Sequence, residues 1–96
     1  MSQPVNVICR LTPDGFACDV VVGTDPDATR HAVMVSQDVL SDLAPGHYDP
    51  EQLVRASFDF LIEREPREAI LRQFELPVIE RYFPGYASRI RRQMAR

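Results

Sequence analysis

The sequence predicts an α+β fold, a three-stranded antiparallel β-meander followed by four or five short helices. Two observations carry this prediction. Residues 4–36 alternate apolar with polar side chains and have turn residues at each break, as half-buried strands do. Residues 37–96 instead place helix-capping residues ahead of apolar stripes at helical spacing. With 96 residues, 45% of them hydrophobic, the chain is expected to form one α+β domain, residues 1–96.

The first two strands are expected to form a hairpin around the turn Thr12–Gly15, where Pro and Gly suit the backbone angles of a tight turn. A register that pairs Cys9 with Cys18 gathers the apolar residues on one face. A slip of one residue would set Cys9 against Asp19 and mix the two faces, so we expect the first register. The alternating apolar residues are Val5, Val7, Cys9 and Leu11 in one strand and Phe16, Cys18, Val20 and Val22 in the other.

The two cysteines are expected to be reduced and to act as small apolar residues in the core. A redox-active pair needs an exposed, electropositive site, and a metal site needs more ligands at closer spacing. The first residues, Met1 to Pro4, do not have the pattern of an export signal, which favours the cytoplasm, where thiols stay reduced. No run of the chain is long and apolar enough to cross a membrane.

A third strand is expected from about Thr29 to Val35, with His31 and Val33 on its apolar face. Asp49 and Pro50 then mark the start of the longest helix, as N-cap and first helical residue. That helix is apolar over more than half of its circumference, so we expect it to contact both the sheet and a second layer. The expected helices run from Ser36 to about Leu43, from Pro50 to about Glu65, from Arg67 to Phe74, from about Leu76 to Phe83, and from Tyr86 to Met94.

Charge is distributed unevenly along the chain. The formal net charge is −3, yet the last sixteen residues carry five arginines and no acid. Three interpretations of this tail are open: a solvated end helix, a surface for nucleic acid or another acidic partner, and pairing with the acidic first half of the protein. The helix–break–helix pattern of residues 67–86 has the outline of a helix-turn-helix, but two helices packed on the longest helix explain it better.

No group of residues predicts catalysis, a metal site or a cofactor. His31 and His47 share no ligand spacing, the serines lie outside any nucleophile motif, and the four glycines are too scattered for a phosphate loop. We therefore expect a protein that is not an enzyme and binds neither cofactor nor metal.

Two stretches of the helical half, residues 56–66 and 68–86, resemble a set of short uncharacterised bacterial hypothetical proteins. They read ASFDFLIEREP and EAILRQFELPVIERYFPGY. The resemblance covers about a third of the chain. It implies a bacterial, cytoplasmic origin and carries over no site residue.

The function expected from the sequence is that of a small protein-interaction module that binds itself, as a homodimer, or another protein, and no membrane. The wide apolar arc of the longest helix and the two open edges of a three-stranded sheet favour this. The weaker alternative is a nucleic-acid-binding regulator that uses the C-terminal arginines. The residues expected to contact a partner are Tyr82, Phe83, Tyr86, Arg89, Arg91 and Arg92.

Overall fold

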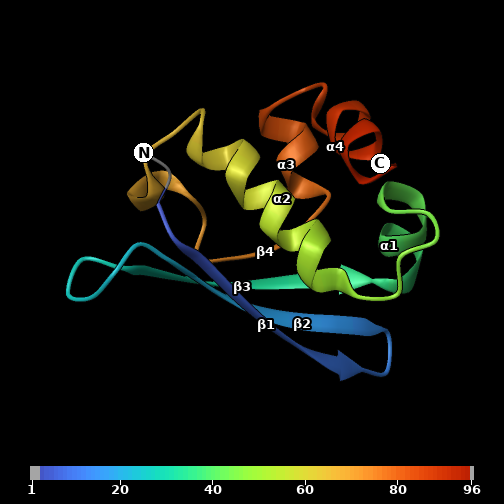
Figure 1. Cartoon of the computed structure of the whole chain (residues 1–96), viewed down its shortest axis with the longest axis horizontal. Coiled ribbons are helices and arrows are strands. Elements are labelled where there is room, and N and C mark those ends of the chain that lie inside the picture. The colour runs from blue at the N-terminus through green and yellow to red at the C-terminus, as the bar shows by residue number, and fades with distance from the viewer. Residues whose placement is uncertain (1–2, 96) are drawn as a thin grey trace.

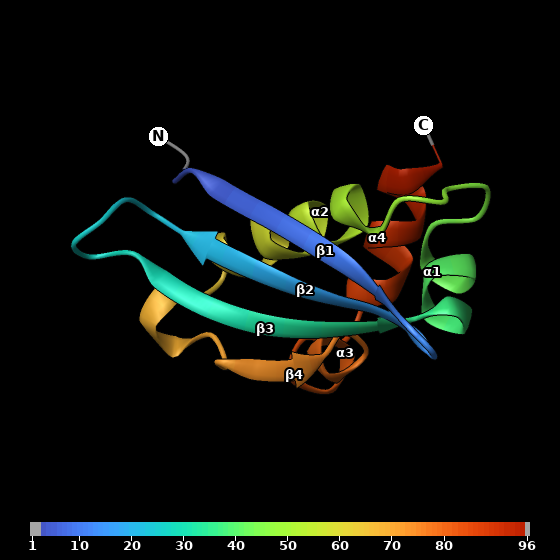
Figure 2. The ribbon, with the colours of Figure 1, turned by 90° about the horizontal axis from the view of Figure 1, so that it is seen from below.

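In the computed structural model, which describes residues 3–95, four strands form one mixed sheet. The strands lie in the order β1-β2-β3-β4, and helices cover only one face of the sheet (Figures 1 and 2). The first three are antiparallel, whereas β4 runs parallel to β3. Their bounds are Val5–Thr12 for β1, Gly15–Val22 for β2, Thr29–Ser36 for β3 and Gln73–Glu75 for β4.

The register expected for the first hairpin is confirmed. Cys9 lies opposite Cys18, and every other pair of β1 and β2 follows from that alignment. The third strand also has the expected orientation, with His31 and Val33 buried on the helix-covered face. Alternation specified these strands because shifting any of them by one residue would have moved its apolar side chains to the open face.

The fourth strand corrects the expectation of a three-stranded sheet and of a helix from Arg67 to Phe74. Only one 3₁₀ turn, Arg67–Ala69, is helical in that segment. The chain then becomes extended and pairs with the free edge of β3, where the amide of Ala32 donates to the carbonyl of Arg72 at 2.7 Å. Pairing satisfies backbone groups that the edge of β3 would otherwise leave open. The sheet therefore draws on the helical half of the sequence, and no helix-turn-helix forms.

The four α-helices follow the expected order. Ser36 and Asp49 cap the first two as expected, since their side chains accept hydrogen bonds from the amides of Val39 and Glu51. The second helix ends at Ile62, a turn earlier than expected. The bounds are Gln37–Leu43 for α1, Pro50–Ile62 for α2, Val78–Tyr82 for α3 and Tyr86–Met94 for α4.

The core lies between the sheet and α2, which crosses the covered face of the sheet (Figure 1). Phe58, in the middle of α2, is fully buried and its ring lies 5.3 Å from that of His31 on β3. On its other side α2 meets α4, where the rings of Phe60 and Tyr86 lie edge to face at 5.3 Å. The expected central position of this helix is thus observed. Among residues 3–95, no helix is long and apolar enough to cross a membrane.

Candidate functional site

Two of the three aromatic residues expected at a partner surface line a cavity. Tyr82 is 66% exposed and Phe83 is partly buried, and both belong to the walls of one apolar cavity. Tyr86 is fully buried under α2. Its side chain is therefore not available to a partner, which removes it from the expected surface patch.

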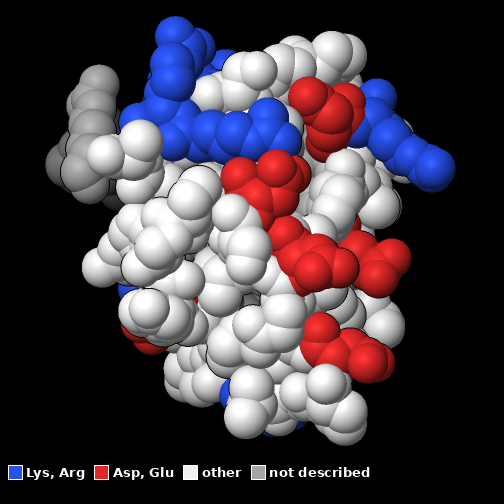
Figure 3. All heavy atoms as spheres, turned by 90° about the vertical axis from the view of Figure 1, so that its right-hand side faces the viewer, with Lys and Arg blue, Asp and Glu red and all other residues white. Residues whose placement is uncertain are grey.

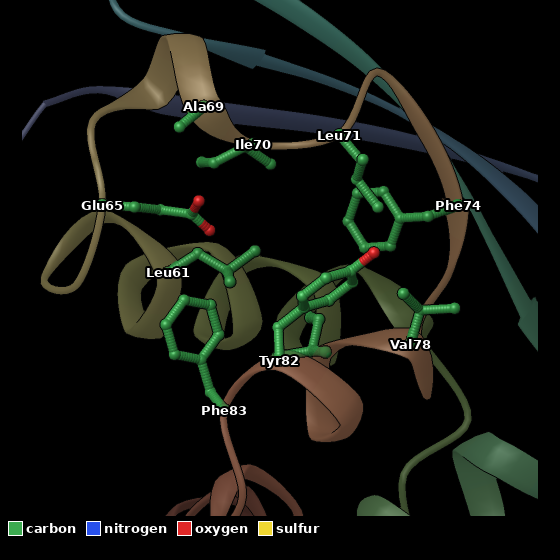
Figure 4. A pocket seen from close by; sticks show the side chains of 10 residues that line it. Leu61, Glu65, Ala69, Ile70, Leu71, Phe74, Val78, Tyr82 and Phe83 are labelled. Carbon is green, nitrogen blue, oxygen red and sulfur yellow. The ribbon is translucent and has the colours of Figure 1, made fainter.

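The cavity lies between the C-terminal end of α2, the segment 69–74 and α3, and has a volume of about 160 Å³. Leu71 and Tyr82 form its solvent-exposed side, since they are 44% and 66% exposed. Figure 4 shows the side chains converging from these three segments. The apolar residues that line it are Leu61, Ala69, Ile70, Leu71, Phe74, Val78, Ile79, Tyr82 and Phe83.

One carboxylate belongs to the same cavity. Glu65 follows α2 in the turn before Pro66, is partly buried, and its amide donates to the carbonyl of Leu61 at 2.9 Å. Figure 4 shows its carboxylate pointing toward Leu61 and Ile70. Burial raises the pKa of this carboxyl group above its ordinary value, because water is displaced from the charged form.

A hydrogen-bond network fixes α3 and α4 beside the cavity. Both carboxylate oxygens of Glu80, on α3, accept from the first amides of α4: Gly85 donates at 3.3 Å and Tyr86 at 3.0 Å. The residue before α4 is glycine with a positive φ of 99°, so it offers no side chain to cap the helix. Glu80 supplies the missing acceptor, and its charge suits the positive end of the helix.

The C-terminal arginines are largely balanced by acids of the same chain. Arg91 lies 2.8 Å from a carboxylate oxygen of Asp42, and Arg89 lies 3.8 Å from one of Glu63. Arg92 is exposed and forms no ion pair with a residue from 3 to 95. Figure 3 shows basic side chains directly beside acidic ones on this end of the molecule. Within residues 3–95, pairing with the acidic first half of the protein is thus observed for Arg91, whereas Arg89 pairs with an acid that follows α2. Arg96 lies outside the described residues.

A second, polar hollow of about 520 Å³ lies between α2 and α4. Asp59, Glu63 and Arg89 line it, and the ion pair between Glu63 and Arg89 belongs to its wall. Burial raises the pKa of the Asp59 carboxyl group, against the opposing effect of Arg55. No group of three or more metal-ligating side chains occurs within residues 3–95.

Both histidines are used inside the structure. His31 Nδ1 lies 2.8 Å from the carbonyl oxygen of Leu71, which only accepts, so Nδ1 carries the proton and donates. Its Nε2 lies 2.9 Å from the hydroxyl of Thr29 and accepts from it. Burial lowers the pKa of His31, so the neutral ring is favoured. His47 Nε2 makes a 2.9 Å hydrogen bond with the carbonyl of Met94.

The cysteines differ from the expectation of two free thiols, because Cys9 and Cys18 form a disulfide between β1 and β2. The sequence predicted correctly that the two cysteines lie opposite each other. Cys18 is buried as expected, and Cys9 is partly buried.

Sequence reasoning missed the cavity and Glu65. No local signal marks either, because the walls come from three segments and an acid beside a proline at a helix end is ordinary. Comparison of the chain with protein-family models, with curated proteins and with solved structures found no match.

Proposed function

We propose that this chain is a non-enzymatic protein-interaction module that self-associates through the outer edge of β1. The observation that carries the proposal is that the outward backbone groups of Val7, Cys9 and Leu11 have no hydrogen-bond partner among residues 3–95. β1 is the first strand of the sheet and is paired on one side only, with β2 (Figure 2). An open edge of this kind is a template for another strand.

The spacing of the strands identifies which groups point outward. The Cα atoms of Cys9 and Cys18 lie 4.0 Å apart, the short spacing of a pair that exchanges no hydrogen bonds. The N–H and C=O groups of Cys9 therefore point away from β2, as do those of Val7 and Leu11, two positions to either side. Among residues 3–95 these groups form no hydrogen bond with another segment.

Groups at both ends of β1 limit strand pairing to the segment from Val7 to Leu11. The carbonyl of Val5, which also points outward, accepts a hydrogen bond from Arg55 of α2. In an antiparallel pair centred on Cys9, Val7 lies opposite Leu11 of the second copy. In the same register Pro13, which has no N–H, lies opposite Val5, whose carbonyl is already occupied. The free groups therefore pair with one another, as a two-fold interface requires.

The side chains of β1 also favour a second copy of the protein at this edge. Ile8 and Leu11 are 73% and 72% exposed, although both are large and apolar. The one charged residue of β1, Arg10, is balanced by Asp19 of β2 at 3.2 Å. A second copy would cover the apolar residues without bringing unpaired like charges together.

The test compares Leu11→Pro with Leu11→Ala. Proline removes only an outward N–H and is tolerated at such an edge position, so the monomer should keep its fold in circular dichroism. We expect light scattering to give the mass of two chains for the wild type and of one chain for Leu11→Pro. Leu11→Ala, which keeps the N–H, should retain a weaker dimer. A wild-type mass of one chain throughout the micromolar to millimolar range, or a dimeric Leu11→Pro, would overturn the proposal.

We propose no enzymatic role because the candidate catalytic side chains are already hydrogen-bonded within the protein. His31 and Ser57 lie in the core with their polar atoms hydrogen-bonded to neighbouring protein groups.

The nucleic-acid alternative stays a prediction, and the ion pairs of Arg89 and Arg91 speak against it. A salt titration with duplex DNA tests it, since binding through arginines weakens steeply with salt.

The cytoplasm stays a prediction for the compartment, and the Cys9–Cys18 disulfide speaks against it. Disulfides are rare in the cytosol and persist in oxidising environments. For a cytoplasmic protein, thiol trapping during lysis of the native cells should recover Cys9 and Cys18 in reduced form. Recovery of the disulfide would place the protein in an oxidising compartment instead.

A further inference from the structure

The size of the apolar cavity indicates what it can hold. Its volume of about 160 Å³ is close to that of an engineered apolar cavity, about 150 Å³, that binds benzene. Its walls include the rings of Phe74 and Phe83 and the branched side chains of Leu61 and Ile70. One aromatic ring or one branched alkyl group of a ligand therefore matches this space.

Glu65 is the one charged residue among those from 3 to 95 that line the cavity. Its carboxylate points into an apolar space, and its side chain makes no hydrogen bond or ion pair with a residue from 3 to 95. The neighbouring arginines are directed elsewhere. Arg64 stacks on the ring of Phe60 and pairs with Glu63, and Arg67 pairs with Glu68.

We propose that this cavity binds a small organic cation, an ammonium group attached by a short linker to one aromatic ring or branched alkyl group. The ring or alkyl group fills the space between Leu61, Ile70 and Phe83, and the ammonium group pairs with Glu65. Glu65 is only partly buried, so water still solvates its carboxylate in the free protein, and a cation would add an ion pair of modest strength. A carboxylate ligand would be repelled, and a neutral one would leave Glu65 without a partner.

Two kinds of ligand carry such an ammonium group beside an apolar group: a free aralkylamine and the N-terminal residue of a peptide. Both present an ammonium group near an apolar side chain. No residue of β1 lines the cavity, so the binding proposed here does not depend on the proposed dimer.

The test measures binding of three matched ligands by chemical-shift titration: 2-phenylethylammonium, 2-phenylethanol and phenylacetate. We expect the ammonium ligand to bind about fivefold more tightly than the alcohol, the gain of one partly exposed ion pair, and phenylacetate to bind most weakly. Glu65→Gln should remove the preference for the ammonium ligand while the alcohol still binds. Glu63→Gln, a matched change of an acid that does not line the cavity, should leave the preference intact.

One further variant and one pair of peptide ligands complete the experiment. Ala69→Leu should fill the cavity and abolish binding of all three ligands. Phe-Gly-Gly-amide compared with its N-acetylated form identifies the peptide source, since only the first has a free ammonium group. Equal affinity of wild type for the ammonium and alcohol ligands, binding unaffected by Ala69→Leu, or no binding of 2-phenylethylammonium at millimolar concentration would overturn the proposal.

Discussion

The hydroxyl groups of Ser57 and Tyr86 lie 2.6 Å apart in the core, where α2 and α4 meet. The Ser57 hydroxyl donates to the carbonyl of Leu53 at 2.8 Å, so its oxygen accepts a hydrogen bond from the Tyr86 hydroxyl. Burial raises the pKa of the Tyr86 hydroxyl well above its ordinary value, because the ionised form would have to leave water. The tyrosine therefore acts as a neutral donor that fixes α4 against α2.

The contributions of Ser57 and Tyr86 to the free energy of unfolding are expected to be coupled. Ser57→Ala leaves the Tyr86 hydroxyl buried without an acceptor and should lower the free energy of unfolding by about 1–3 kcal/mol. Tyr86→Phe should cost about 1 kcal/mol. The double variant should cost about 1 kcal/mol less than the sum of the single changes, as measured by urea unfolding. Strict additivity would show that the two hydroxyl groups do not interact.

Glu80→Ala is expected to destabilise the α3–α4 corner. The change removes the acceptor for the amides of Gly85 and Tyr86 and should cost about 1 kcal/mol, the usual effect of losing a helix cap. Glu80→Gln keeps an acceptor and should cost less. Glu75→Ala, an exposed acid on β4, is the matched control and should change the free energy of unfolding by less than about 0.5 kcal/mol. An equal effect of Glu75→Ala and Glu80→Ala would contradict the capping role.

His31 is expected to make stability depend on pH. Burial lowers its pKa in the folded protein below the ordinary value of 6.5, so the unfolded chain binds more protons as the pH falls below 6.5. The His31 contribution to stability is therefore present above pH 6.5 and is lost as the pH falls toward the folded pKa. The raised pKa values of Asp59 and Glu65 act in the opposite direction, since those groups favour the folded state as they become protonated.

Comparing His31→Asn with the wild type isolates the histidine term, because both proteins share Asp59 and Glu65. The difference in free energy of unfolding between the two proteins should shrink as the pH falls from 7 to 5. A proton NMR titration of the wild-type His31 ring should give a midpoint below 6.5. A midpoint at or above 6.5 would contradict the burial argument.

The Cys9–Cys18 disulfide is expected to stabilise the protein chiefly by restricting its unfolded chain. Closing a loop of this length should contribute about 2–3 kcal/mol to the free energy of unfolding. Reduced and oxidised wild-type protein should therefore differ by that amount in urea unfolding, whereas a Cys9→Ala/Cys18→Ala variant should not respond to reductant. A difference near zero would mean that the disulfide adds nothing to the free energy of unfolding beyond the pairing of β1 with β2.

Local patterns in the sequence were enough to predict the hairpin, the third strand, the caps of α1 and α2 and the central position of α2. In each case the signal is local. Alternation fixes which face of a strand is buried, and Ser36 and Asp49 bond to amides two or three residues away.

Contacts between distant segments set the conformation of residues 67–75, the burial of Tyr86 and the cavity beside Glu65. The helical spacing of Ile70 and Phe74 fits a helix, but a helix there would leave the edge of β3 unpaired, whereas β4 forms hydrogen bonds with that edge. Tyr86 is buried because α2 covers it, and the cavity exists only where three separate segments meet. Such features depend on contacts between residues far apart in sequence, which no local pattern encodes.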